Sequence, residues 1–145
     1  MNVQAILSRK GTAVATVQPS ATLAQATASL RDHGIGALVV SANGRTIDGI
    51  LSERDVVRAL AAHGSSTLGR DVASAMSANV VVCQCDDTVD QLMAMMTDRR
   101  IRHLPVLDTR GEMAGIISIG DVVKARLGEL ELENNQLHDY IQGRA

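Results

Sequence analysis

Aromatic side chains are almost absent from this sequence of 145 residues, which has one Tyr and neither Phe nor Trp. Proteins that bind single-stranded nucleic acid stack its bases on aromatic side chains, so this class is disfavoured. An excess of one charge is also missing, because 14 Lys and Arg oppose 16 Asp and Glu, for a net charge of −2. A basic surface that follows a phosphate backbone is therefore not expected, and nucleic acid is not predicted as a partner.

Long apolar runs are missing as well. No stretch approaches the roughly 18 apolar residues of a membrane span, and residues 1–10 lack the apolar core of a signal peptide. We therefore expect a cytoplasmic protein that does not contact a membrane. The two cysteines, Cys83 and Cys85, are too few for a disulfide framework, so reduced thiols are expected. A hydrophobic content of 46% is enough for one modest domain with a buried core, which excludes disordered and collagen-like classes.

The sequence has instead an internal repeat. A shift of 66 residues aligns Thr22 with Thr88 and continues without a gap. The densest identity joins residues 49–55 (Gly-Ile-Leu-Ser-Glu-Arg-Asp) to residues 115–121 (Gly-Ile-Ile-Ser-Ile-Gly-Asp). A match this long in one register indicates a duplicated structural unit.

Each copy predicts a β-α-β-β-α unit, and together they predict an α/β fold. Strands are expected from β-branched content and turn residues at 13–17, 37–41 and 47–51, and again at 79–83, 103–107 and 113–117. The first helix of each copy begins with a Thr-x-x-Gln capping box, at Thr22 and at Thr88. Ser52 and Ser118 are expected to cap the second helices, and Gly34 is expected to end the first one.

A unit of about 60 residues buries too little surface to be stable alone, so the copies are expected to pack sheet to sheet with pseudo-two-fold symmetry. The predicted division is residues 1–68, residues 69–127 and a helical tail at 128–145. Similar short segments at 3–7 and 72–76 precede the two copies, and both are expected to dock as helical turns.

The repeated Ser-x-x-Asp motif, Ser52 to Asp55 and Ser118 to Asp121, combines groups that suit a nucleotide. Free N–H groups at a helix N-terminus favour an anion, and a carboxylate can accept hydrogen bonds from ribose hydroxyls. The same pattern is also a common helix cap, so two caps without a ligand are the alternative.

These motifs resemble those of a tandem pair of cystathionine-β-synthase (CBS) domains, also called a Bateman module. Residues 101–106 (Ile-Arg-His-Leu-Pro-Val) and the pattern Pro19-x-x-Thr22-Leu23 belong to the same resemblance, which covers nearly the whole chain and is greatest to small stand-alone members. It implies the CBS fold and an adenine nucleotide bound between the copies as a regulatory ligand. AMP is the first candidate, followed by NAD(H), ADP or ATP, and no catalytic cofactor is implied.

The resemblance also implies two sites, each taking its Asp from one copy and its base and phosphate contacts from the other. The first site is expected to contain Ile50, Ser52, Arg54, Asp55, Val81, Arg102 and His103. The second is expected to contain Gln18, Ile35, Gly36, Ala37, Ile116, Ser118, Gly120 and Asp121. Residues 36–37 (Gly-Ala) stand where the first site has Arg102 and His103. The second site is therefore expected to lack cationic partners for a phosphate and to bind more weakly.

Catalytic signatures are absent from the sequence: it has no Gly-x-Ser-x-Gly elbow, Walker A motif or His-Glu-x-x-His motif. The prediction is a non-catalytic regulator that senses energy or redox state.

One alternative function is an interaction module with empty sites. Another is a thiol or metal sensor using Cys83 and Cys85, which requires a neighbouring cation to lower a thiol pKa. No metal site is predicted, because two thiols at this spacing are poor evidence for zinc.

The end of the chain carries a heptad pattern. Its members follow one another at steps of 3, 4, 3 and 4 residues: Leu127, Leu130, Asn134, Leu137 and Ile141. Asn134 occupies an a position, where Asn fixes the register of parallel coiled coils. The pattern predicts a homodimer through the C-terminal helix, and the resemblance adds the helices of the CBS domains as an interface. Because two heptads are marginal in water, a tail folded back on its own module is the alternative.

Overall fold

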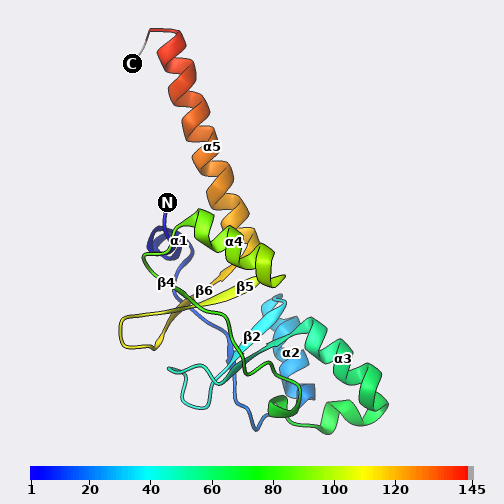
Figure 1. The fold of residues 1–145 in the computed structure, drawn as a ribbon. Coiled ribbons are helices and arrows are strands. Elements are labelled where there is room, and N and C mark those ends of the chain that lie inside the picture. The colour runs from blue at the N-terminus through cyan, green and yellow to red at the C-terminus, as the bar shows by residue number, and fades with distance from the viewer. Residues whose placement is uncertain (144–145) are drawn as a thin grey trace.

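The computed structural model describes residues 1–143 and confirms the duplicated α/β architecture (Figure 1). The first repeat contains β1 (Thr16–Val17), α2 (Leu23–His33), β2 (Ala37–Val40), β3 (Gly49–Ser52) and α3 (Glu53–His63). The second contains β4 (Cys83–Gln84), α4 (Val89–Arg99), β5 (His103–Leu107), β6 (Met113–Ser118) and α5 (Ile119–Ile141). Three short helices precede or join the repeats: α1 (Val3–Lys10) and the 3-10 helices η1 (Gly64–Gly69) and η2 (Val72–Ser74).

The two repeats form separate three-stranded sheets of the same topology. β1 is parallel to β2 and β2 antiparallel to β3, and β4, β5 and β6 repeat this arrangement. Leu38 pairs with Leu51 in one sheet and Leu104 with Ile117 in the other, and all four side chains are fully buried. Each repeat therefore builds a core of its own.

The predicted helix caps are all present. Thr22 and Thr88 form capping boxes with the Gln three residues later, and Ser52 and Ser118 form them with Asp55 and Asp121. α2 ends at Gly34, whose φ of 62° and ψ of 38° lie in the left-handed region that favours glycine.

The first strand of each repeat is shorter than predicted. Strands were expected at residues 13–17 and 79–83, but only Thr16–Val17 and Cys83–Gln84 pair with a neighbour. β1 has one parallel partner, and residues 13–15 line a cavity between the repeats, although the Ala15 carbonyl still accepts a hydrogen bond from the Val39 N–H at 3.2 Å. The β-branched content of residues 13–15 predicts a strand, and it cannot distinguish residues in a sheet from residues that line a cavity.

The segments that precede the repeats dock as helical turns, as predicted, and they are exchanged between the repeats. α1 precedes the first repeat but packs on the second, where the Val3 N–H donates to the Asp87 carbonyl at 2.9 Å. η2 precedes the second repeat but packs on the first, where the Val72 N–H donates to the Ala21 carbonyl at 2.8 Å. Val3 and Val72 are fully buried, so these reciprocal arms hold the repeats together.

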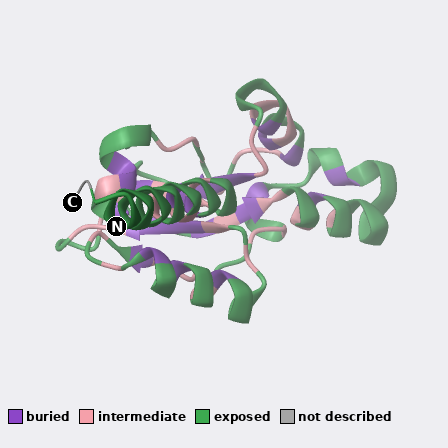
Figure 2. Ribbon diagram, turned by 90° about the horizontal axis from the view of Figure 1, so that it is seen from above, coloured by how far each residue is buried: buried purple, intermediate pink, exposed green. Residues whose placement is uncertain are grey.

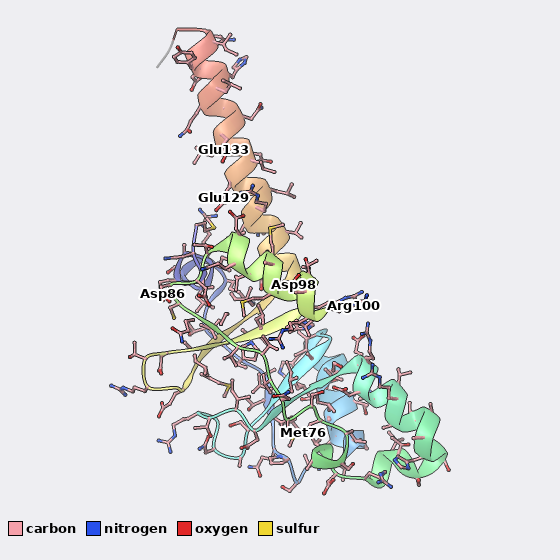
Figure 3. The ribbon with its side chains drawn as sticks, viewed as in Figure 1. Met76, Asp86, Asp98, Arg100, Glu129 and Glu133 are labelled. Carbon is pink, nitrogen blue, oxygen red and sulfur yellow. The ribbon has the colours of Figure 1, made fainter. Side chains whose placement is uncertain are left out.

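The glycine of the repeated motif makes room for these arms. A Cβ on Gly49 would lie 2.7 Å from the sulfur of Met76 and 2.8 Å from the carbonyl oxygen of Ser77. Met76 belongs to the arm that crosses to the first repeat (Figure 3). A Cβ on Gly115 would lie 2.6 Å from Cδ2 of Leu7, on the other arm. Close packing against the arms, independent of any ligand, therefore favours glycine at both positions.

α5 is one continuous helix whose C-terminal half extends away from both repeats (Figure 1). Val122 and Ala125 near its start are buried, whereas its later turns are exposed (Figure 2). The alternative of a tail folded back on its own module is therefore wrong. Within residues 1–143, no helix combines the length and the apolar character needed to cross a bilayer.

Candidate functional site

A cavity of about 550 Å³ lies between the two repeats. The first repeat contributes residues 13–15 and the turn from α2 to β2. The second repeat contributes β5 and β6, together with the end of α1, which packs on it. The lining residues are Lys10, Ala13, Val14, Ala15, His33, Gly34, Ile35, Gly36, Ala37, His103, Ile116 and Ser118. Ligand pockets usually measure about 300–1,000 Å³ and combine apolar walls with a few polar groups, and this cavity fits that description.

The cavity gathers most of the residues predicted for the second site. Five of them line it: Ile35, Gly36, Ala37, Ile116 and Ser118. Asp121 lies beside it, since its carboxylate is hydrogen-bonded to the lining residues Ser118 and Lys10. Gln18 and Gly120 are not among the lining residues. Of the residues predicted for the first site, His103 lines this cavity, whereas Ile50, Ser52, Arg54, Asp55, Val81 and Arg102 do not.

Asp121 is held by its own helix cap and by α1. Its Oδ2 accepts hydrogen bonds from the Ser118 N–H at 2.9 Å, the Ser118 hydroxyl at 3.0 Å and the Lys10 ammonium at 2.7 Å. Desolvation is the largest influence on the pKa of Asp121 and raises it, but the bonds from Lys10 and Ser118 together bring the pKa below its usual value. Its Oδ1 accepts no hydrogen bond from residues 1–143, so one carboxylate oxygen is free for further donors.

Lys10 is a cationic residue of the cavity lining that sequence reasoning missed. It comes from the last turn of α1, and its ammonium also donates to the Ile116 carbonyl at 2.8 Å. The expectation that this site lacks a cation is wrong, because the cation comes from an arm rather than from residues 36–37. No spacing pattern could have revealed it, since Lys10 and Asp121 are 111 residues apart and α1 lies outside the repeat.

His103 adds another polar group to the cavity lining. A Cβ on Gly36 would lie 3.6 Å from Cε1 of His103 and 3.5 Å from Oε1 of Glu53. Burial is the largest influence on the pKa of His103, and with Lys10 and Arg102 it outweighs Glu53 and Asp121 and lowers that pKa. The imidazole is therefore neutral at pH 7 and can donate one hydrogen bond and accept another.

Asp55 repeats the cap geometry without the lysine. Its Oδ2 accepts from the Ser52 N–H at 2.9 Å and from the Ser52 hydroxyl at 3.0 Å. Within the part of the chain that the structure describes, no cationic side chain forms an ion pair with Asp55. The two motifs thus differ in their surroundings and not in their local geometry.

Cys83 does not meet the requirement for a thiol sensor. Cys83 is 1% exposed, and burial, followed by Asp87 and Cys85, raises its pKa to about 12. A thiol with so high a pKa is a poor nucleophile, so Cys83 lacks the lowered pKa that the alternative of a thiol sensor requires. Among residues 1–143 there is also no group of three or more His, Cys, Asp or Glu side chains able to hold a metal ion.

Comparison with known proteins defines the class of this chain. The CBS domain family model matches residues 5–62 and again residues 70–128. The protein therefore belongs to the CBS domain family and contains a tandem CBS pair.

Two relatives show how widely this similarity extends. The chain is 40% identical over 126 residues to "CBS domain-containing protein CBSX3, mitochondrial" of Arabidopsis thaliana, which covers 84% of this chain and 61% of that protein. This chain thus spans about three fifths of the length of that relative. The crystal structure of the CBS-domain containing protein ATU1752 from Agrobacterium tumefaciens is 50% identical, with a TM-score of 0.81 over 86% of this chain and 98% of that one. The cytoplasmic location stays a prediction, and the name of the plant relative places that protein in mitochondria.

Two more distant crystal structures contain ligands. CBSX2 in complex with AMP is 22% identical, with a TM-score of 0.74 over 88% of this chain and 97% of that one. The CBS pair of MJ0100 in complex with 5′-methylthioadenosine and S-adenosyl-L-methionine is 23% identical, with a TM-score of 0.77 over 89% and 98%. At these identities the likeness shows the fold alone.

Proposed function

We propose that this protein is a non-catalytic regulatory module that binds an adenosine compound in the cavity between its repeats. The observation that carries the proposal is the convergence of the Asp121 carboxylate, the Lys10 ammonium and the Ser118 hydroxyl at one cavity with small aliphatic walls. The ligands of CBSX2 and MJ0100 have the adenosine group in common, which supports this class of ligand.

Each part of such a ligand has a matching group. The free Oδ1 of Asp121 can accept from a ribose hydroxyl, and Lys10 can contact a phosphate while its other N–H groups keep their present bonds. The cavity lining contains no Phe, Tyr or Trp side chain. Adenine would therefore lie against Ile35 and Ile116 and be selected by shape and by backbone hydrogen bonds.

We also propose a second site at Asp55, completed by the other residues predicted for it: Ile50, Ser52, Arg54, Val81 and Arg102. The ranking made from sequence placed this site first because the other lacked a cation. With Lys10 beside Asp121 and His103 in the same cavity, we now rank the Asp121 site first.

A ligand that touches both repeats can report to a partner by shifting their relative packing. It can do so only by its difference in affinity for two arrangements, typically about 1–3 kcal/mol. Homodimerisation through α3 and α5 would transmit that shift, and both helices expose apolar side chains, such as Val57 and Val123. AMP, ADP, ATP or NAD(H) would make the module a sensor of energy or redox state.

Isothermal titration calorimetry of nucleotide-stripped protein tests this function. AMP, ATP, NADH and S-adenosylmethionine are titrated separately, with GMP as a control for the base. Saturable binding of one or more adenosine ligands, with GMP silent and the bound ligand recovered unchanged by chromatography, is the expected result. If no adenosine ligand binds, the proposal is wrong and the alternative of an interaction module with two helix caps takes its place. Turnover of a ligand would contradict the non-catalytic assignment.

A further inference from the structure

α5 carries a stripe of apolar side chains that nothing in the described chain covers. We call this stripe the α5 seam, and its members are Val123, Leu127, Leu130, Asn134, Leu137 and Ile141. Its apolar members are between 45% and 73% exposed. It extends the heptad pattern of the sequence by one step, to Val123, whose exposure only the structure reveals. A stripe this long exposed to water is typical of a surface that another helix covers.

The seam faces away from the chain's own module. Val122 and Ala125 are buried against the second repeat, where α5 contacts α4, and Arg126 lies 3.7 Å from Asp90 of α4. Because each residue turns an α-helix by about 100°, the seam lies on the side of α5 roughly opposite Val122 and Ala125. Glu129, which is labelled in Figure 3, is not part of the seam and forms an ion pair of 2.8 Å with the N-terminal amine of Met1. No part of residues 1–143 is placed to cover the seam.

We propose that the α5 seam pairs with the same seam of a second copy, as a parallel two-stranded coiled coil over residues 123–141. Asn134 favours this occupant and this direction. In a parallel pair an a residue faces its own counterpart, so the two Asn134 amides hydrogen-bond to each other. In an antiparallel pair Asn134 would face a leucine at a d position and bury an unpartnered amide.

The charges that flank the seam complement each other in the parallel arrangement. A g residue then faces the e residue five positions later in the other helix. This places Arg126 opposite Glu131 and Glu133 opposite His138, each twice by symmetry. Arg126 already contacts Glu129 at 3.0 Å, and its five N–H donors leave room for a second carboxylate.

Such a coiled coil also fixes how the two modules face each other. Its two-fold axis runs along the helices, so α5 meets α5 and the second repeat lies against the second repeat. Val123 at the base of the seam, next to the module, brings the two bodies together in that orientation. This goes beyond dimerisation as such, because it excludes a dimer in which α5 meets α3.

The oligomeric state of the full chain tests the pairing. Sedimentation velocity over a concentration series is expected to show a dimer for the wild type. The double variant Leu130→Glu/Leu137→Glu is expected to dissociate at least 100-fold more readily. Leu132→Glu is the matched control, because Leu132 lies on the same helix, is 59% exposed and is not part of the seam. Unchanged far-UV circular dichroism and urea midpoints would show that the variants fold. We expect this result because the substituted side chains are exposed to solvent in the single chain.

Cysteine cross-linking tests the direction. The single variants Leu127→Cys and Leu137→Cys are mixed, oxidised and mapped by peptide mass spectrometry, which separates new disulfides from those of Cys83 or Cys85. The expected products are 127–127 and 137–137 disulfides. A 127–137 disulfide would mean antiparallel helices, because an antiparallel pair that places Asn134 opposite Leu130 also places Leu127 opposite Leu137. A monomeric wild type, or a dimer that survives the double substitution, would overturn the proposal.

Discussion

The first and second repeats build the same cap and place it in different surroundings. Ser52 and Ser118 donate to their Asp partners at the same distances, 2.9 Å from the N–H and 3.0 Å from the hydroxyl. Asp121 also accepts from Lys10 at 2.7 Å and lies beside the cavity, and Asp55 does neither. The two repeats thus carry the same capped carboxylate. Only the carboxylate of the second repeat also has a cation beside it, and that cation comes from an arm outside the repeat.

The arms themselves differ in how tightly they pack, and this gives the largest expected effect. Gly49→Ala is expected to lower the free energy of unfolding by about 1–3 kcal/mol, because its Cβ would meet the Ser77 backbone carbonyl, which cannot move alone. Gly115→Ala is expected to cost less, because its Cβ would meet only the end of the Leu7 side chain, which can change rotamer. Urea unfolding of both variants measures the difference, and equal costs would show that the arms are packed alike.

Ligand affinity is the next measurement that distinguishes the repeats. Asp121→Asn is expected to weaken adenosine-ligand binding about tenfold, the value of one charge-assisted hydrogen bond, and Asp55→Asn to weaken it less. Asn keeps an oxygen for the helix cap, so each variant serves as the other's control for folding. Calorimetry decides the order, and a greater loss for Asp55→Asn would support the ranking made from the sequence alone.

Much of this comparison could be predicted from the sequence, because repeats and caps are local patterns. The 66-residue register aligned the two Asp residues, and the Thr-x-x-Gln and Ser-x-x-Asp spacings located all four caps. Lys10 could not be placed, because its partner is 111 residues away and only the exchange of arms brings them together. The sequence predicts strand at residues 13–15, because aliphatic side chains suit a sheet and a cavity wall equally well.

The ion pair between Lys10 and Asp121 gives a smaller effect that depends on pH. Because the pKa of Asp121 in the folded protein is below its usual value of 3.8, this carboxylate stabilises the fold above that pH. The contribution is lost as the pH falls through the lowered pKa. Lys10→Met is therefore expected to cost up to about 1 kcal/mol at pH 7 and less near pH 3, since the pair is partly exposed. Urea midpoints at the two pH values measure this, and an equal cost at both would assign the loss to packing of α1.

The smallest expected effect comes from the position where the repeats differ in chemistry but not in role. Cys83 pairs with Val106 in the second sheet, as Val17 pairs with Val40 in the first, and a shift of 66 residues aligns Cys83 with Val17. Cys83→Val is therefore expected to change the free energy of unfolding by less than about 1 kcal/mol, because one small buried apolar side chain replaces another.

In the native protein at pH 8, iodoacetamide is expected to leave Cys83 unmodified, since burial and a pKa of about 12 keep its thiol protonated and shielded. Cys85, which is half-buried, is the internal control. Equal alkylation of the two thiols would contradict this, and it would mean that β4 opens in the native protein, so that a thiol sensor in the second repeat would have to be considered again.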